Sequence, residues 1–288
     1  MPSSTSSSAQ AARQAVADQL REFRERAGLT GRQLAAAAGW QPQKVSRIEH
    51  GVRPISAADL AEWCRVCGVP SQRVEELMAE RSAAAGMWTT MQRFHRAGLK
   101  QAQESVREMY EAVRQFRCYQ SAVVPGLLQT AEYTTAGLES VRDLLGLTVD
   151  DVADAVAERM DRQGILRRSG KQFVFVVEEH VLHHRVCDRE AHIEQLAHLA
   201  AVMRLPAVSL NIVPLDIERR LRWPCEGFVL MDGPSGVKAT VELVSGYLQI
   251  TNPSETLLYR QEFDALLGRS VTGDRARRII AAATARLT

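Results

Sequence analysis

Hydrophobic residues near the N-terminus recur at helical spacing, which predicts a bundle of short helices. Val16, Leu20 and Phe23 lie three or four residues apart with Arg and Glu between them, and this first helix is expected to end at Gly28. Further helices are predicted at residues 31–38 and 42–50, after the capping residue Ser56, and from Ser71 onward. Residues 1–12 are rich in Ser and Ala and are expected to form a disordered tail.

The second and third predicted helices are joined at Gly39, where a left-handed backbone is least costly. Pro42 suits the first turn of the third helix, because the missing N–H group would have no partner there. Val45 and Ile48 are expected to face the core. The outward positions of this helix are Gln43, Lys44, Ser46 and Arg47. Two short helices joined at a glycine, within a bundle of five, predict a helix-turn-helix domain of the repressor type.

The pattern changes after residue 87, where short apolar runs begin to alternate with helical segments. Strands are predicted at residues 172–177, 208–213 and 247–251, with a hairpin formed by 228–231 and 237–244. Helices are predicted at residues 98–115, 148–167, 178–187, 190–204, 253–268 and 272–287. The chain is therefore expected to be an all-α five-helix helix-turn-helix domain followed by a mixed α/β C-terminal domain. The expected boundaries are 13–87 for the first domain, 88–115 for a linker and connecting helix, and 116–288 for the second domain.

Positive charge is concentrated in the predicted helix-turn-helix region. The 288-residue chain has a net charge of +2, yet residues 13–53 carry eight basic and four acidic side chains. A local excess of this kind is expected where a protein meets phosphate groups. No apolar run approaches the roughly 20 residues that cross a bilayer, and the N-terminus lacks the features of a signal peptide. We therefore expect a cytoplasmic protein with no membrane association.

The segment 31–51 closely resembles the helix-turn-helix of the phage-repressor-like regulators. The alanines after Leu34, together with Gly39, Val45, Ile48, Glu49 and Gly51, stand where that pattern has them. The resemblance implies binding to double-stranded DNA as a homodimer, with the third helix in the major groove. The expected base contacts are Gln43, Lys44 and Arg47. The expected backbone contacts are Arg32, Gln33, Ser46 and Arg53. Glu49 is expected to be structural, holding backbone N–H groups or a nearby arginine.

Two later motifs carry a second resemblance, which covers nearly the whole chain. Residues 124–130 (VPGLLQT) with Tyr133, and residues 158–166, are similar to the C-terminal domain of a family of actinomycete regulators. That family joins a repressor-type helix-turn-helix to an antitoxin-like domain of uncharacterised function. Its members are usually encoded beside a small partner protein, which the C-terminal domain is thought to bind. The expected partner or ligand surface comprises Leu127, Leu128, Gln129, Tyr133, Arg159 and Arg162. The apolar residues among them could instead anchor the loop to the core, and the arginines could belong to a salt-bridged helix face.

The residues do not predict an enzyme, a metal or another cofactor. His180, His184 and Cys187 would share one face of a helix at 178–187, but the metal-binding pattern His-Glu-x-x-His is absent. Cys64 and Cys67 form an isolated CxxC within a helical pattern, which favours packing over zinc. The loop 232–236 is typical of a turn and lacks the Lys-Ser/Thr pair of a phosphate-binding loop.

Three functions are compatible with these observations. The first is a transcriptional regulator controlled through its C-terminal domain by a small protein partner. The second is a transcriptional regulator whose C-terminal domain binds a small molecule. The third is an enzyme fused to a DNA-binding module. Co-purification of a small protein, a bound metabolite and substrate turnover, respectively, would distinguish them.

Overall fold

The computed structural model describes residues 7–52, 55–86, 88–219, 223–234 and 236–288. The chain divides into two compact units, Met1–Thr89 and Thr90–Thr288. Within the described residues, no helix combines the length and the apolar character that spanning a membrane requires.

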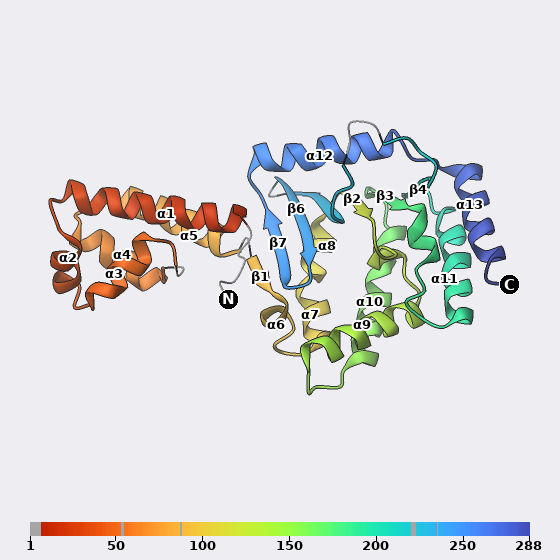
Figure 1. The fold of residues 1–288 in the computed structure, drawn as a ribbon, viewed down its shortest axis with the longest axis horizontal. Coiled ribbons are helices and arrows are strands. Elements are labelled where there is room, and N and C mark those ends of the chain that lie inside the picture. The colour runs from red at the N-terminus through yellow and green to blue at the C-terminus, as the bar shows by residue number, and fades with distance from the viewer. Residues whose placement is uncertain (1–6, 53–54, 87, 220–222, 235) are drawn as a thin grey trace. The chain divides into compact units, whose positions relative to one another are not determined.

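The N-terminal unit is helical, as the sequence predicts (Figure 1). Its helices are α1 (Ser7–Arg26), α2 (Gly31–Ala37), α3 (Pro42–Glu49), α4 (Ala57–Val66) and α5 (Ser71–Gly86). They surround a core in which Leu20, Leu34, Leu60, Trp63 and Leu77 have no exposed surface. The indole of Trp63 also donates a hydrogen bond to the backbone oxygen of Leu20 at 3.0 Å, which ties α4 to α1.

The predicted helix ends and the predicted cap are confirmed, except at the N-terminus of α1. Gly28 and Gly39 both have φ of +69°, the left-handed backbone that ends α1 and α2. Ser56 caps α4 by accepting a hydrogen bond from the backbone N–H of Asp59. Helix α1 begins at Ser7, however, so residues 7–12 are helical where a disordered tail was expected. Alanine is the strongest helix former, and it allows α1 to extend toward the N-terminus.

The described strands form a mixed sheet with the order β1-β7-β6-β5-β2-β3-β4, of which β2 to β7 lie within the C-terminal unit. The strands are β1 (Trp88–Thr90), β2 (Gln115–Gln120), β3 (Gln172–Glu178), β4 (Val208–Val213), β5 (Phe228–Gly233), β6 (Gly236–Leu243) and β7 (Gly246–Ile250). Strands β2, β3 and β4 pair in parallel, whereas β5, β6 and β7 continue the sheet from β2 in antiparallel fashion. The predicted mixed α/β class is therefore confirmed.

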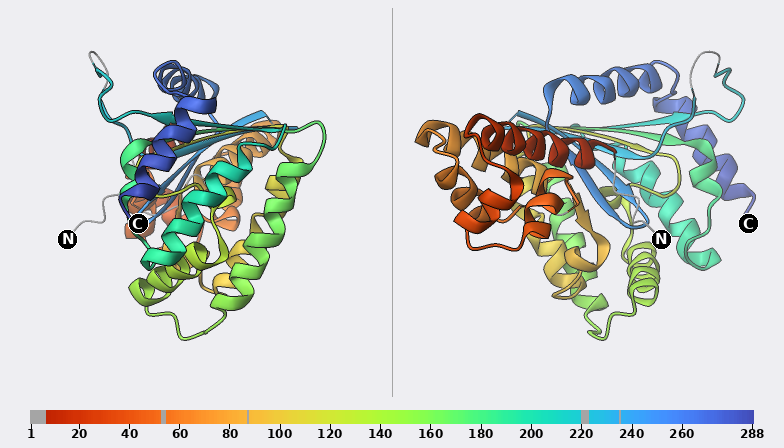
Figure 2. Two further views of the ribbon diagram at one scale, coloured as in Figure 1. Left: turned by 90° about the vertical axis from the view of Figure 1, so that its right-hand side faces the viewer. Right: turned by 60° about the vertical axis from the view of Figure 1, so that its left-hand side comes forward.

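Helices cover both faces of this sheet (Figure 2). The α-helices are α6 (Met91–Phe94), α7 (Leu99–Ser105), α8 (Arg107–Ala112), α9 (Ala131–Leu145), α10 (Val152–Arg162), α11 (Arg189–Val202), α12 (Pro253–Leu267) and α13 (Gly273–Ala285). Short 3-10 turns are η1 (Gly126–Leu128), η2 (Gln163–Arg167) and η3 (Glu179–His183). Parallel strands need a crossover connection, and α9 with α10 supplies it between β2 and β3, while α11 supplies it between β3 and β4.

Three predicted elements of this unit differ from the structure. The helix expected at 98–115 is divided at Val106 into α7 and α8, and its last residue belongs to β2, a central strand that was not predicted. The helix expected at 148–167 is shorter, because Asp151 rather than Thr148 precedes its first turn and η2 follows it. The helix expected at 178–187 is only the short turn η3, since Glu178 completes β3.

Candidate nucleic-acid interface

Helix α3 presents a polar face and buries an apolar one. Val45 and Ile48 are buried in the N-terminal core, where they hold the helix against its neighbours. Gln43, Ser46 and Arg47 are exposed, and their spacing of three and four residues places them on one side of the helix. Among side chains, amides and guanidinium groups make the most specific contacts with base edges, so this face has the chemistry of a reading helix.

His50 extends this face and was not predicted. It follows α3 directly, is exposed, and lies at the next position of the spacing that joins Gln43, Ser46 and Arg47. Its Nδ1 lies 2.7 Å from the backbone oxygen of Ser46. Because a carbonyl oxygen only accepts, this contact requires a proton on Nδ1 and leaves Nε2 for another partner. The seven-residue spacing from Gln43 was the sequence signal that could have identified it.

Lys44 lies apart from this face and is already engaged. Its ammonium group is 2.6 Å from Oδ1 of Asp59 and 4.2 Å from the centre of the Trp40 ring. A side chain held by a carboxylate and an aromatic face must leave both to reach a base edge. The structure thus gives Lys44 a role in joining α3 to α4, and it does not group Lys44 with Gln43 and Arg47.

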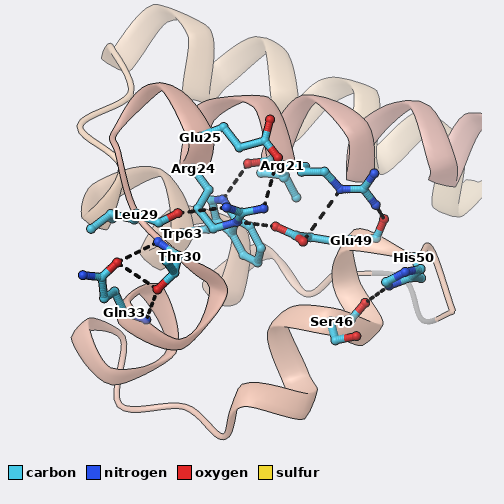
Figure 3. A network of polar contacts seen from close by, with 11 residues as sticks. Arg21, Arg24, Glu25, Leu29, Thr30, Gln33, Ser46, Glu49, His50 and Trp63 are labelled. Atoms are coloured by element: carbon cyan, nitrogen blue, oxygen red, sulfur yellow. Dashed lines mark hydrogen bonds and ion pairs between the residues drawn. The ribbon is translucent and has the colours of Figure 1, made fainter.

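Helix α2 contributes two of the predicted backbone contacts. Arg32 and Gln33 are both exposed in its first turn. Gln33 also completes a capping box with Thr30: its Oε1 accepts hydrogen bonds from the N–H and hydroxyl groups of Thr30, each at 2.8 Å (Figure 3). The amide nitrogen of Gln33 points away from Thr30, so the box fixes the side chain while leaving its donors on the outer side.

The segment that carries this face is uniformly basic. Between Arg26 and Glu49 the sequence has three basic residues, Arg32, Lys44 and Arg47, and no acidic one. Nothing in this segment therefore repels phosphate groups. Arg53, the fourth predicted backbone contact, lies outside the described residues.

Glu49 holds the end of α3 to α1, as the sequence predicts. Its carboxylate accepts a hydrogen bond from Nε of Arg24 at 2.6 Å, and its backbone oxygen accepts one from Arg21 at 2.7 Å (Figure 3). Arg24 also donates a hydrogen bond to the backbone oxygen of Leu29 at 2.8 Å, and this bond fixes the turn before α2. The network therefore joins α1, the turn before α2 and the end of α3, and stabilises the position of the exposed face.

The apolar residues of the predicted C-terminal surface are buried. Leu127 and Leu128 belong to η1 and pack in the main core of the C-terminal unit. Tyr133 is also buried, and its hydroxyl oxygen accepts a hydrogen bond from the N–H group of Val124. The expectation that these three residues form a partner or ligand surface is wrong. The turn at Pro125 directs the following leucines into the core, so the motif anchors the loop.

Gln129, Arg159 and Arg162 form a polar network beside that anchor. Gln129 is buried, and its Oε1 accepts a hydrogen bond from Nη1 of Arg159 at 2.9 Å. Oε1 of the buried Gln103 accepts hydrogen bonds from both arginines, at 3.1 Å from Arg159 and 2.7 Å from Arg162. The salt-bridged alternative applies to Glu158 and Asp161, which pair with Arg107 instead.

The histidine cluster does not have the arrangement expected of a metal site. His180 and His184 contact the backbone oxygens of Ser121 and Ala122, respectively. His184 and Cys187 lie beyond η3, so they share no helical face with His180. Among the described residues, no group of three or more potential metal ligands is found.

Comparison with known families agrees with the two-unit fold. A helix-turn-helix domain matches residues 15–77, which indicates a DNA-binding regulator. A domain of unknown function, DUF5753, matches residues 103–282, and the chain belongs to the family that this domain defines. No curated protein and no solved structure matches the chain.

Proposed function

We propose that this protein is a sequence-specific transcriptional regulator that reads double-stranded DNA with α3. Gln43 and Arg47 contact base edges in the major groove, while Arg32, Gln33 and Ser46 contact the phosphate backbone. Lys44 supports α3 rather than reading bases. The observation that carries the proposal is the exposed, acid-free face of α2 and α3 on a helix-turn-helix whose position Glu49 fixes.

The regulator acts as a homodimer whose DNA binding is controlled through the C-terminal unit. A single reading helix contacts few base pairs, and two-fold symmetric binding doubles the site. The resemblance to antitoxin-like regulators encoded beside a small protein supports control by such a partner. The C-terminal unit has no enzymatic activity in this proposal. The small protein is expected to bind outside the η1 motif, because Leu127 and Leu128 are buried.

The test is selection of bound DNA from a random pool by the full-length protein and by two variants. Arg47→Ala removes a proposed base contact from α3. Arg65→Ala removes an equal charge from α4, where the guanidinium is already paired with Glu62 at 2.6 Å. We expect the wild-type protein and the Arg65→Ala variant to enrich the same palindromic motif. The Arg47→Ala variant should bind that motif more weakly by about 1–3 kcal/mol and tolerate changes at the base pair it reads.

Two outcomes would contradict the proposal. If Arg47→Ala weakened binding to all sequences equally, Arg47 would contact phosphate and not bases. If the wild-type protein enriched no motif, either alone or with a co-purifying small protein, α3 would not read sequence. A motif without two-fold symmetry would contradict only the homodimer.

A further inference from the structure

One face of the C-terminal sheet is apolar along β2, β3 and β4 but polar along β6 and β7. On this face Phe116, Phe173 and Met231 belong to the main core. In the pairing of β5 with β6, Lys238 lies opposite Met231. Every second residue of β6 from Lys238 onward therefore lies on the same face. The polar positions of this face are Lys238, Thr240 and Glu242 on β6 and Tyr247 and Gln249 on β7.

Arg159, Arg162 and Lys238 make no ion pair with any acidic residue that the structure describes. Arg162 is 7% exposed and makes its hydrogen bonds to Gln103, while Arg159 bonds to Gln103 and Gln129. Among the described residues, no carboxylate oxygen lies within 4 Å of either guanidinium group. Lys238 is half-buried and likewise has no ion pair within the described part of the chain.

The arginines and the polar strands belong to one site. The ring of Tyr110 lies 5.0 Å from the guanidinium carbon of Arg162, and its centre lies 5.6 Å from that of the Phe116 ring, whose sheet face continues through Met231 to Lys238. The hydroxyl of Tyr247 donates to Oε1 of Glu242 at 3.2 Å. Arg162 of α10 and the polar residues of the β6–β7 hairpin therefore lie on the same side of the sheet.

The charged groups on this side of the sheet are partly desolvated. Glu242 is exposed, yet desolvation is the main cause that raises its pKa. Desolvation also lowers the pKa of Lys238 and of Arg159. The charged groups are thus held where their electrostatic interactions are stronger than on an open surface.

Two buried polar atoms on the same elements have no hydrogen-bond partner. They are Nε of Arg162 and Oγ1 of Thr240. Buried polar atoms are almost always paired, so unpaired ones require an explanation such as a ligand or bound water. Here one is on a guanidinium that lacks an acidic partner, and the other is on the polar strand face.

We propose that the C-terminal unit binds a small organic anion between α10 and the β6–β7 hairpin. Arg159, Arg162 and Lys238 would hold a carboxylate or phosphate group, because guanidinium groups bind such planar or tetrahedral anions in a bidentate manner. Glu242 and Tyr247 would accept hydrogen bonds from a hydroxyl or amino group on the same molecule. The site gives the regulator a small-molecule input, and it stands independently of DNA recognition by α3.

The proposal is tested by thermal unfolding of the full-length protein without DNA. The probes are inorganic phosphate, glucose 6-phosphate and citrate, each compared with sodium chloride at equal ionic strength. Variants Arg159→Gln and Lys238→Gln remove one cation each from opposite sides of the site. Arg142→Gln is the matched control, because Arg142 of α9 is paired with Asp143 and with Asp150 in the loop that follows α9. The unliganded variants are first checked for native circular dichroism and cooperative melting.

We expect at least one organic probe to raise Tm by about 3–10 °C at about 10 to 100 times its Kd. The phosphate and carboxylate probes distinguish which acid the site prefers. The rise should persist in Arg142→Gln and disappear in Arg159→Gln and Lys238→Gln. No rise with any probe, or an equal rise in all three variants, would overturn the proposal. Because DNA is absent, neither result depends on the DNA-binding proposal.

Discussion

Arg24 in the N-terminal unit and Arg159 in the C-terminal unit are both largely withdrawn from solvent, but their partners differ. Arg24 is 12% exposed and forms a 2.6 Å ion pair with Glu49, whose side chain is 11% exposed. Among the described residues, Arg159 hydrogen-bonds only to the amide oxygens of Gln103 and Gln129. The pKa shifts are opposite: the hydrogen bond to Glu49 raises the pKa of Arg24, whereas burial and the neighbouring Arg162 lower that of Arg159.

This difference separates a structural network from a binding site. A buried cation with a carboxylate partner is neutralised within the protein, and it fixes the elements that it joins. Buried cations that have only neutral acceptors keep their charge available for an incoming anion. Such an arrangement costs stability, as binding sites commonly do. Glu49 and Arg24 accordingly fix the face that we propose to read DNA, and Arg159 and Arg162 are the cations of the proposed anion site.

The largest expected change in stability is the loss caused by Glu49→Gln. This substitution leaves Arg24 with the longer 3.4 Å contact to the exposed Glu25 as its ion pair, and it weakens the link between α1 and α3. We expect the free energy of unfolding of the N-terminal unit to fall by about 2–3 kcal/mol, somewhat less than for a fully buried pair. Urea unfolding followed by tryptophan fluorescence measures this change, because Trp63 is buried beside the network (Figure 3).

Glu62→Gln is the control for that measurement. Glu62 pairs with Arg65 through an exposed contact within α4, and pairs of this kind contribute little to stability. The urea midpoint of this variant should match that of the wild-type protein. Equal midpoints for Glu49→Gln and Glu62→Gln would show that the Arg24 network does not stabilise the helix-turn-helix.

A smaller change in the free energy of unfolding, and one of opposite sign, is expected for Arg159→Met. Both acceptors of Arg159 keep another donor after the substitution, since Gln103 retains Arg162 and Gln129 retains Thr134. The repulsion between Arg159 and Arg162 is also removed. The C-terminal unit should therefore be unchanged or more stable by up to about 1 kcal/mol in the absence of ligand. Thermal unfolding monitored by circular dichroism provides the test, and a loss of more than about 2 kcal/mol would make Arg159 a structural anchor.

The N-terminal unit could be predicted well from sequence because its signals are local. Helical periodicity placed Val45 and Ile48 inside and Arg47 outside, and the capping residues and glycines gave the helix ends. The partners of Lys44 could not be predicted, because Asp59 comes from another helix. Only the fold brings the two residues together.

The C-terminal unit was harder to predict because its organisation depends on distant strands. Strand β2 contains Gln115 and Arg117, whose polarity does not suggest a central strand, and its neighbours β3 and β5 follow much later in the chain. Arg159 and Arg162 were predicted as site residues from a motif resemblance. Their relation to Glu242 and Tyr247 requires the sheet register and could not be inferred from spacing.

The smallest expected effect is on the pH dependence of stability, through His95 near Arg159. His95 is 3% exposed, and burial and the charge of Arg159 lower its pKa below the usual 6.5. A lowered pKa in the folded state means that the unfolded chain binds the proton first. This contribution to stability is therefore present above about pH 6.5 and is lost as the pH falls through the folded-state pKa. We expect the C-terminal unit to be less stable at pH 5 than at pH 7.5, and His95→Gln to reduce that difference.

Arg159→Met should also reduce the difference in stability between the two pH values, because one of the two causes that lower the pKa of His95 is removed. If His95→Gln kept the full acid sensitivity, His95 would not be its source; if only Arg159→Met kept it, the charge of Arg159 would not act on the pKa of His95.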